Sequence, residues 1–237
     1  MRDRINSEII RKELKVFSNK DKAKILQGFF KTGPGEYAAG DIFIGVKVPE
    51  IRSVVNRNLS ISLREVRILL VSAIHEERLA ALLFLVAKFE KELNNKDEIY
   101  NLYIQNTKYI NNWDLVDSSA HRIVGAYLLN KDKDILYKLA SSDLLWERRI
   151  AIISTFYYIK NNVFRDALKI SEQLLNDEHD LIHKAVGWML REIGKRNLSS
   201  EEKFLKDYCK IMPRTMLRYA IERFPINKRI AYLKGAI

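Results

Sequence analysis

The 237-residue sequence contains few residues of several kinds, and each shortage excludes a class of protein. Its single cysteine, Cys209, excludes an internal disulfide and any metal cluster built from several cysteines. Only 9 glycines and 4 prolines are present, which argues against a β fold with many turns and favours helices. The longest apolar run, residues 79–87, is far shorter than the roughly 20 residues that span a bilayer. No apolar signal-peptide core follows residues 1–4, so we expect a soluble protein of the cytoplasm.

Acidic residues are outnumbered by basic ones. The chain has 41 lysines and arginines against 30 aspartates and glutamates, which gives a formal net charge of +11. Such an excess indicates an acidic partner, with nucleic acid as the first candidate and an anionic membrane as the second. A generally basic proteome produces the same excess, so charge alone does not decide the partner.

The first 61 residues are expected to hold two amphipathic helices, at 4–17 and 21–31, followed by a loop. The loop, residues 32–41, carries three of the nine glycines, so the backbone turns sharply there. No Gly-Lys-Ser/Thr sequence follows the loop, which excludes a phosphate-cradling P-loop. Residues 42–46 are predicted to be extended, and Pro49 is predicted to start another helix, because proline favours the first helical turn.

From residue 62 to residue 224 the hydrophobic pattern predicts helices in regular pairs, with a period of about 35 residues. The expected pairs are 62–73 with 76–91, 95–107 with 112–129, 132–141 with 145–160, 164–176 with 180–196, and 200–211 with 213–224. Residues 225–237 are expected to be a C-terminal tail. Such pairs stack into a solenoid whose second helices line a concave face. The sequence therefore predicts one all-α domain, residues 1–237, folded as a superhelical solenoid with a concave basic face.

One stretch near the middle of the chain, residues 111–117, brings an aromatic residue and an acid together. Trp113 and Asp117 are four residues apart, so on a helix they lie on the same face, one turn apart. Asp114 is rotated by roughly 100° from Trp113, and we expect it to cap the helix start or to form a pair there. Taken alone, this stretch has an ordinary interpretation as core packing beside one satisfied carboxylate.

The three tryptophans recur at similar places in the repeats, and this recurrence is more informative than any single tryptophan. Each lies in the second helix of an expected pair, and cations surround them; the residues concerned are Trp113, Trp146, Trp188, Arg148, Arg149, Lys184, Arg191 and Lys195. Aromatic and cationic side chains on one concave face are typical of a surface that binds a polyanion. Each piece also has an ordinary interpretation, tryptophan as core and arginine as a solvated face. The four histidines, His75, His121, His179 and His183, are scattered and are given no role.

Several motifs of the chain resemble the signature of a known family. These motifs are Trp113-Asp114-Leu115-Val116-Asp117, Trp146-Glu147-Arg148-Arg149 and Lys184-Ala185-Val186-Gly187-Trp188-Met189-Leu190-Arg191-Glu192, with further similarity at 43–49 and 213–220. Together they are similar to the bacterial DNA alkylation repair glycosylases built from HEAT-like repeats, the AlkD family. The resemblance covers most of the chain and implies a solenoid of HEAT-like helical pairs. Three motifs in order are far more specific than any one of them.

The resemblance implies an enzyme that removes N3- or N7-alkylated purines from duplex DNA. It implies that Asp117 is the catalytic acidic residue and that Trp113 and Trp188 flank the deoxyribose of the lesion. Arg149 matches a phosphate-contacting residue, and Arg148 is the adjacent alternative if the match shifts by one. Two departures concern the lesion preference: the loop at 32–41 is longer than in shorter members of the family, and Asn112 stands where some members carry an aromatic residue.

The chemistry of this reaction agrees with a single carboxylate. An N3- or N7-alkylated purine is positively charged and leaves as a neutral base, so no general acid is needed. Departure of the base builds oxocarbenium character on the sugar, as in glycoside hydrolysis, and Asp117 can stabilise that charge and orient the attacking water. We therefore expect no cofactor and no metal. Both a base flipped into a pocket and a base left in the stack are compatible with these residues.

The expected partner is duplex DNA carrying alkylated bases, bound by Arg149, Arg148, Lys184, Arg191 and Trp146. We expect a monomer near the nucleoid, without a membrane or an obligate protein partner. Two alternatives stand beside the enzyme. A non-enzymatic nucleic-acid-binding protein would use the same basic face without depending on Asp117. A protein-binding scaffold would have little affinity for DNA, and the net charge of +11 argues mildly against it.

Overall fold

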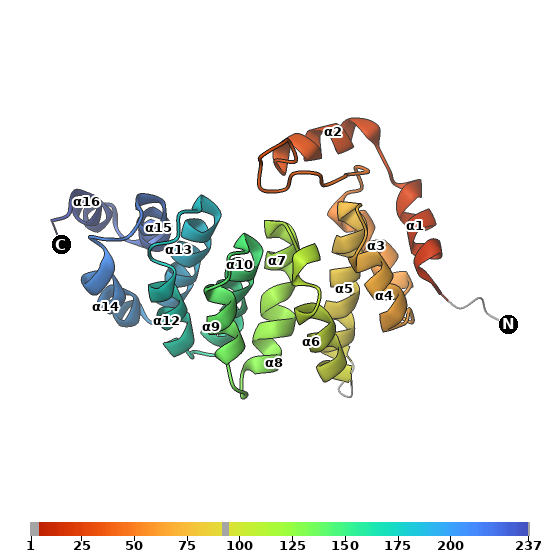
Figure 1. The fold of residues 1–237 in the computed structure, drawn as a ribbon. Helices are drawn as coiled ribbons and strands as arrows, with labels where there is room; N and C mark the ends of the chain where they lie inside the picture. Colours follow the sequence, from red (N-terminus) through yellow and green to blue (C-terminus); the bar gives the residue numbers. More distant parts are fainter. Residues whose placement is uncertain (1–4, 92–94, 237) are drawn as a thin grey trace. The chain divides into compact units, whose positions relative to one another are not determined.

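A computed structural model describes residues 5–91 and 95–236 and gives an all-α chain, which confirms the predicted fold class (Figure 1). Within the described residues, the only strand-like pairing is an isolated parallel bridge between Ile42 and Ile74. The contacts divide the chain into two compact units, residues 1–119 and 120–237, which we call unit 1 and unit 2 and describe separately. The start of the helix predicted at 4–17 lies outside the described residues.

Unit 1 consists of short helices, three of which have side-chain caps, and one long buried helix. Asn6, Asn19 and Ser62 each accept a hydrogen bond from a backbone N–H in the first turn of the following helix, which fixes where those helices begin. Pro49 lies in the first turn of its helix, as predicted. The elements are α1 (Ser7–Val16), α2 (Lys20–Phe29), α3 (Val48–Arg57), α4 (Leu63–Leu70), α5 (His75–Lys91), α6 (Lys96–Ile104), the 3-10 turn η2 (Thr107–Tyr109) and α7 (Trp113–Ala120).

Unit 2 continues the pattern of antiparallel helical pairs. The helix that begins with α7 passes into a π-helical turn at His121, a feature that often marks functional sites. The elements are η3 (His121–Gly125), α8 (Ala126–Leu128), α9 (Asp134–Ala140), α10 (Leu145–Ser154), α11 (Phe156–Lys160), α12 (Arg165–Gln173), α13 (Asp180–Gly194), α14 (Leu198–Tyr208), α15 (Arg214–Ala220), the 3-10 turn η4 (Ile221–Arg223) and α16 (Ile226–Lys234).

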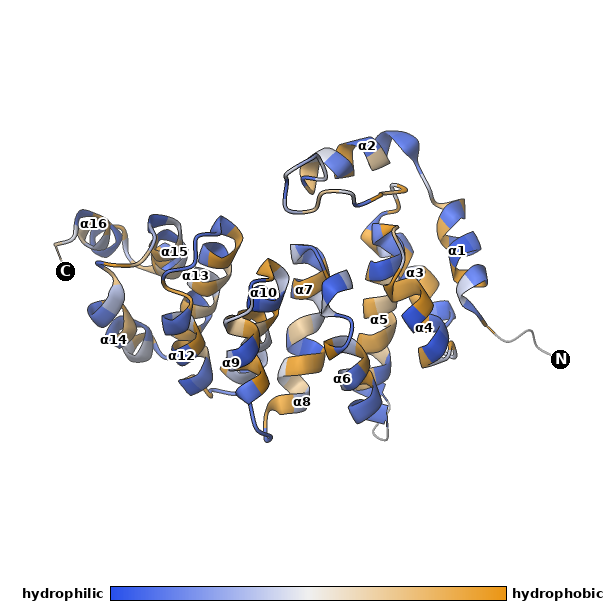
Figure 2. Ribbon diagram, in the orientation of Figure 1, coloured by the Kyte–Doolittle hydropathy of each residue, from blue (hydrophilic) through white to orange (hydrophobic). Residues whose placement is uncertain are grey.

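The core of each unit lies along the second helices of the pairs. In α5, every side chain from Leu79 to Val86 is buried, so this helix is surrounded on all sides. Figure 2 shows the middle of α5 as a hydrophobic segment, whereas α2 mixes both kinds of residue. In unit 2, Gly187 lets α13 approach α15 closely, because a Cβ there would lie 2.4 Å from the backbone oxygen of Met216. None of the residues of α2 is buried, which sets this helix apart.

The repeat predicted from the sequence is visible in individual hydrogen bonds. Arg78 of α5 donates from Nη1 to the backbone oxygen of Ser72, six residues earlier, at 2.9 Å. Arg148 of α10 donates in the same way to the backbone oxygen of Ser142, also six residues earlier and at 2.9 Å. The two arginines are separated by 70 positions, which is twice the predicted period of about 35 residues. The equivalent arginines therefore hold the loop before their helix in both units.

Most helix positions agree with the predictions, and three details differ. The helix predicted at 145–160 is divided at Thr155, whose hydroxyl donates to the backbone oxygen of Ile152. The helix predicted at 112–129 contains the π turn η3. Residues 226–234 of the predicted tail form α16, which Pro225 precedes and Gly235 ends with a φ of 70°. The curvature and the basic concave face stay predictions, as does the single domain.

Candidate active site

The candidate site begins on α7, whose first two turns carry Trp113 and Asp117. Both side chains are half-buried, while Leu115, Val116 and Ser119 on the other side of the helix are buried. Asp117 is electrostatically close to Tyr103: burial first, and then the negative charge of Asp117, raise the pKa of the Tyr103 phenol. Since α7 is anchored by its buried side, the Asp117 carboxylate is presented on the side that reaches the surface.

Asp114 lies three residues before Asp117 on α7 and pairs with a side chain of α5 at the start of the helix. Its Oδ2 lies 2.8 Å from Nε2 of His75, the first residue of α5. The other ring nitrogen of His75, Nδ1, lies 3.1 Å from Oδ2 of Asp41, and the His75 side chain is only 2% exposed. The expectation that Asp114 forms a pair near the helix start is confirmed, and its partner is a histidine that the sequence analysis left without a role.

Asp41 extends this network to a buried arginine. Its Oδ1 accepts hydrogen bonds from Arg78 Nη2 at 2.7 Å and from Asn111 Nδ2 at 3.1 Å. Arg78 also donates to Oδ1 of Asn111 at 3.0 Å, and its side chain is 3% exposed. Asn111 directly precedes the helix turn with Trp113, so the network joins the glycine-rich loop, α5 and the entry to α7. We call Asp41, His75, Arg78 and Asp114 the buried charge network.

The pKa shifts in this network favour ionised groups. Burial lowers the pKa of His75, but its hydrogen bonds to Asp114 and Asp41 outweigh burial and raise the pKa above its usual value. Burial likewise raises the pKa of Asp41, while the hydrogen bond from His75 and the charge of Arg78 lower it below its usual value overall. The favoured state is therefore an imidazolium that donates to two carboxylates, which holds the start of α7 against α5.

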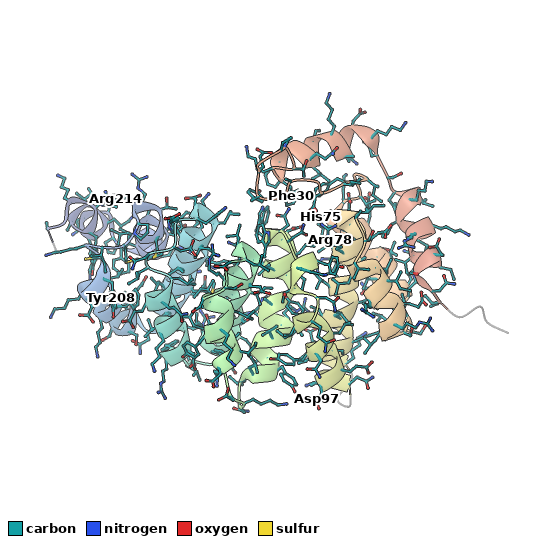
Figure 3. The ribbon with its side chains drawn as sticks, viewed as in Figure 1. Phe30, His75, Arg78, Asp97, Tyr208 and Arg214 are labelled. Carbon is teal, nitrogen blue, oxygen red and sulfur yellow. The ribbon has the colours of Figure 1, made fainter. Side chains whose placement is uncertain are left out.

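A stack of rings supports Trp113 from the side of α2. Trp113 stacks on Phe30 with centroids 5.2 Å apart, Phe30 on Phe43 at 5.1 Å, and Phe43 on His75 at 4.3 Å. Phe29 meets Trp113 edge-on at 6.0 Å. Figure 3 labels Phe30, His75 and Arg78 in this region of unit 1. The pair Phe29-Phe30 at a helix end and Phe43 in an extended segment were visible signals in the sequence, although only the fold connects them with Trp113.

The extended segment that carries Phe43 is held by Glu76. The backbone N–H groups of Ile44, Gly45 and Val46 donate to its Oε1 at 3.1, 2.8 and 3.2 Å. Gly45 adopts a φ of 81°, and a Cβ there would lie 2.1 Å from the backbone oxygen of Asn19, so only glycine fits. One buried carboxylate thus replaces strand pairing for this segment and fixes the ring of Phe43.

In unit 2, the two predicted phosphate-binding arginines are engaged within the protein. Arg148 donates from Nε to Oδ2 of Asp177 at 2.6 Å, and its side chain is 20% exposed. Arg149 is buried and donates from Nη1 to the backbone oxygen of Leu181 at 2.5 Å. Arg148 is thus the repeat equivalent of Arg78, which gives it a structural task. A phosphate contact by either arginine stays a prediction.

The other predicted residues of unit 2 lie on α10 and α13. Trp146 is buried, and Trp188 is half-buried beside Phe156, with ring centroids 5.6 Å apart. Lys184 forms an ion pair with Asp180 at 2.6 Å, and Arg191 pairs with Glu222. On α15, Arg214 and Arg218 are exposed and have no ion-pair partner among the described residues. Figure 3 labels Arg214, and neither of these two cations of α15 was among the DNA-binding residues predicted from the sequence.

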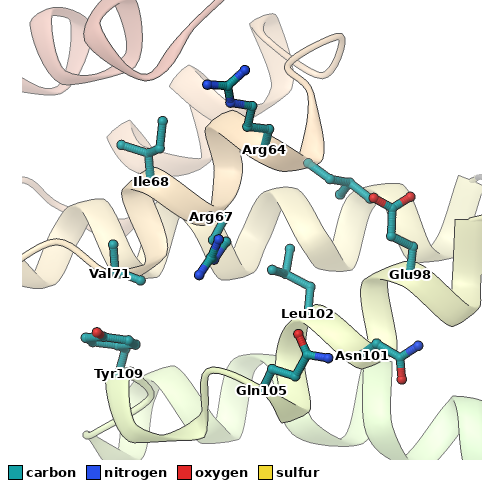
Figure 4. A pocket seen from close by; sticks show the side chains of 10 residues that line it. Arg64, Arg67, Ile68, Val71, Glu98, Asn101, Leu102, Gln105 and Tyr109 are labelled. Carbon is teal, nitrogen blue, oxygen red and sulfur yellow. The ribbon is translucent and has the colours of Figure 1, made fainter.

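Unit 1 also contains two hollows at its surface. A cavity of about 390 Å³ lies beneath α2, beside the ring stack. A wider, open groove of about 950 Å³ lies between α4 and α6, with Arg64 and Arg67 on one wall and Gln105 on the other (Figure 4).

Across residues 5–91 and 95–236, no group of three or more acidic, histidine or cysteine side chains is placed to hold a metal ion. No helix in those ranges is both long and apolar enough to cross a membrane.

Comparison with known proteins agrees with this description. A solved structure titled as a predicted DNA alkylation repair enzyme from Enterococcus faecalis shares the fold, with a TM-score of 0.71 and 18% sequence identity over 88% of this chain and 97% of that chain. No curated protein matches the chain. The model of the family described as DNA alkylation repair enzyme matches residues 10–224. Since this match spans most of the sequence, the chain belongs to the family of DNA alkylation repair enzymes.

Proposed function

We propose that this DNA repair enzyme is a glycosylase that hydrolyses the N-glycosidic bond of N3- or N7-alkylated purines in duplex DNA. The observation that carries the proposal is the pair on α7: a half-buried carboxylate, Asp117, one turn after a half-buried tryptophan, Trp113. The helix that carries both is held by the ion pair of Asp114 with His75. A carboxylate fixed in this way is preorganised to face a positive charge that develops on a sugar.

The reaction needs only one carboxylate because the substrate base is already cationic. The C1′–N bond breaks, its electron pair leaves with the base, and the base becomes neutral. Asp117 stabilises the oxocarbenium-like sugar, orients a water molecule and accepts its proton as the new C1′–O bond forms. Trp113 offers an aromatic face to the same cationic sugar, a contribution of about 0.5–2 kcal/mol. In this proposal Trp188 flanks the sugar as well, and no cofactor or metal takes part.

DNA is held mainly through its phosphates in this proposal. Cations of unit 2 supply the contacts, with Arg148, Arg149, Lys184 and Arg191 as predicted from the sequence, Trp146 beside them, and the exposed Arg214 and Arg218 added. Phosphate contacts position the protein without reading sequence, so affinity falls steeply as salt rises. The protein acts as a monomer on cytoplasmic, nucleoid DNA and needs no protein partner.

The test is incubation of the full chain with duplex DNA that carries 7-methylguanine and 3-methyladenine, followed by chromatography of the released bases. We expect free methylated bases and abasic sites in equal amounts, and no release from unmodified DNA. Salt-dependent binding to the duplex without any release of base would instead support the non-enzymatic nucleic-acid-binding alternative. Absence of both binding and release would support a protein-binding scaffold.

A further inference from the structure

The groove between α4 and α6 is open, whereas the corresponding helices of unit 2 are joined by hydrogen bonds. α4 and α6 are the first helices of consecutive pairs, and so are α9 and α12. Tyr137 of α9 donates from its hydroxyl to Oδ1 of Asp166 on α12 at 2.7 Å, and Gln173 Nε2 donates to the backbone oxygen of Tyr137 at 3.1 Å. Within the described residues, no side chain of α4 forms a hydrogen bond or an ion pair with α6. A space of about 950 Å³ is left between these two helices of unit 1.

Each wall of this groove is one face of a helix. The lining follows the spacing i, i+4 and i+7 on both sides, which keeps residues on the same helical face. Figure 4 shows side chains of both helices pointing into the shared space. Ile68 and Val71 on the α4 side are apolar and yet 37% and 38% exposed. The residues at this spacing are Arg64, Ile68 and Val71 on one side and Glu98, Leu102 and Gln105 on the other.

The dimensions of the groove fit a third helix. α4 has 8 residues and α6 has 9, so each is roughly 12–14 Å long at a rise of 1.5 Å per residue. About two turns of another helix fit along that length, and two turns present anchors at i, i+4 and i+7. Apolar anchors at these positions would cover Ile68, Val71 and Leu102 from water, and burial of such side chains is what drives a helix into a groove.

The charges of the groove specify one edge of that helix. Arg64 and Arg67 are exposed, lie one turn apart and have no ion-pair partner in the described part of the chain. Acidic side chains beside α4 would pair with both of them. A nucleic-acid backbone fits the groove less well, because its phosphates would meet the like charge of Glu98 and gain nothing from the apolar side chains.

We propose that the groove between α4 and α6 docks an amphipathic helix of a partner protein, with aspartate or glutamate on the edge of its apolar stripe that faces α4. Burial of the stripe supplies affinity, while the pairs with Arg64 and Arg67 set the orientation and the choice of partner. A contact of about two turns is small, so the complex is weak and reversible. The proposal goes beyond the proposed reaction and does not depend on it, because no residue that lines the groove belongs to the candidate active site.

The test uses two stapled helical peptides as probes. Both carry leucine at i, i+4 and i+7; one has glutamate along one edge of this stripe, and the other has lysine at the same positions. Binding to the full chain is followed by fluorescence anisotropy at about 150 mM salt, where distant charges are screened. The variants are Arg67→Glu and Ile68→Asp. Their controls are Arg52→Glu, the same charge change at an exposed site on α3, and Ile230→Asp, at a site on α16 that is 44% exposed; both lie outside the groove.

We expect saturable one-to-one binding of the glutamate peptide, which Arg67→Glu and Ile68→Asp each weaken at least tenfold while both controls stay within twofold of wild type. Arg67→Glu should also bind the lysine peptide more tightly than wild type does, because the charge pair is reversed. Circular dichroism checks that all four variants keep the helical fold.

The proposal is overturned if the glutamate peptide does not saturate, if wild type binds both peptides equally, or if the groove variants match their controls. Duplex DNA that loses affinity through Arg67→Glu but not through Arg52→Glu would assign the groove to nucleic acid instead. A wild-type dimer in sedimentation that Ile68→Asp separates would assign it to a second copy of the chain. Either of these two results also overturns the proposal.

Discussion

The two units treat buried charge in different ways. In unit 1, the buried carboxylate of Asp41 is paired with His75 and Arg78, and these partners hold its pKa below the usual value. In unit 2, the buried carboxyl of Glu201 has one oxygen without a partner among the described residues, and burial raises its pKa to about 8. This difference shows that a buried carboxylate holds neighbouring elements together only where the fold also supplies its hydrogen-bonding and charged partners.

The equivalent arginines show the same contrast. Arg78 and Arg148 hold the same kind of loop carbonyl, but Arg78 is 3% exposed inside a network of four charges. Arg148 is 20% exposed and has one acidic partner, Asp177. Arg148 only connects neighbouring repeats of unit 2, whereas Arg78, at the equivalent position of unit 1, also belongs to the network that holds the start of α7. We therefore expect the same substitution to cost more in unit 1 than in unit 2.

The largest expected effect is that of Arg78→Ala. Removing this guanidinium leaves Asp41 and Asn111 underpaired in a buried site, which should lower the free energy of unfolding by about 3–5 kcal/mol. Arg148→Ala removes charged hydrogen bonds that water can partly replace, so we expect a loss of about 1–3 kcal/mol. Urea unfolding followed by circular dichroism measures both, and equal losses would remove the contrast between the units.

The next effect concerns the charge of His75. His75→Gln should lower the free energy of unfolding by about 3 kcal/mol near pH 6, because two carboxylates lose a shared cation. The pKa of His75 is raised in the folded state, so its stabilising contribution is complete below its unfolded pKa and is lost as pH rises through its folded pKa. The difference in the free energy of unfolding between wild type and His75→Gln should therefore become smaller when urea unfolding is repeated at alkaline pH. A gap that widens with pH would show that His75 is buried as a neutral ring.

Glu201 makes the stability of unit 2 depend on pH as well. Its pKa is raised mainly by burial, whereas the pKa of His75 is raised by its acidic partners. The folded-state pKa of Glu201, about 8, lies above the usual value, so the unfolded chain releases the proton first as pH rises. Stability should consequently fall between the two pKa values by up to about 1.4 kcal/mol per pH unit. Glu201→Gln should remove this decline and be more stable than wild type at pH 9. Thermal unfolding of wild type and Glu201→Gln at pH 5, 7 and 9 measures this difference in stability. The same dependence on pH in both proteins would contradict a raised pKa of Glu201.

The sequence predicted the helices well because each has a local cause. Period, caps and Pro49 place the helix starts, and the separation of Arg78 and Arg148 by 70 positions preserves the repeat that the pattern indicated. Trp113 and Asp117 lie on one helix as their spacing predicted. The buried charge network was not predictable in the same way, since Asp41, His75 and Asp114 are far apart in the chain and only tertiary packing joins them.

The arginines show why residue roles are harder to predict than helices. A cation next to Trp146 has the same appearance in a sequence whether it contacts a phosphate or a backbone carbonyl. Arg149 turned out to be buried, and Arg148 ties two repeats together. Arg214 and Arg218 of α15 lie in the segment 213–220 that resembles the family, but only their exposure in the structure separates them from the other cations.

Asp114 is not a suitable control for experiments on Asp117. Asp114 is bound to the buried His75, so Asp114→Asn would disturb the support of α7 together with any effect on the reaction. Asp207 on α14 is exposed, and Asp207→Asn removes the same charge without disturbing that support. Asp207→Asn is therefore the matched control.

The most direct test of the account is the single-turnover rate of 7-methylguanine excision by Asp117→Asn, measured beside wild type and Asp207→Asn. Asparagine keeps the size of the side chain and removes its charge, so the account predicts a fall of at least tenfold. This corresponds to about 1.4 kcal/mol of lost transition-state stabilisation, with unchanged urea unfolding. Asp207→Asn should equal wild type. An Asp117→Asn rate within twofold of wild type would contradict the assignment of the catalytic carboxylate to α7.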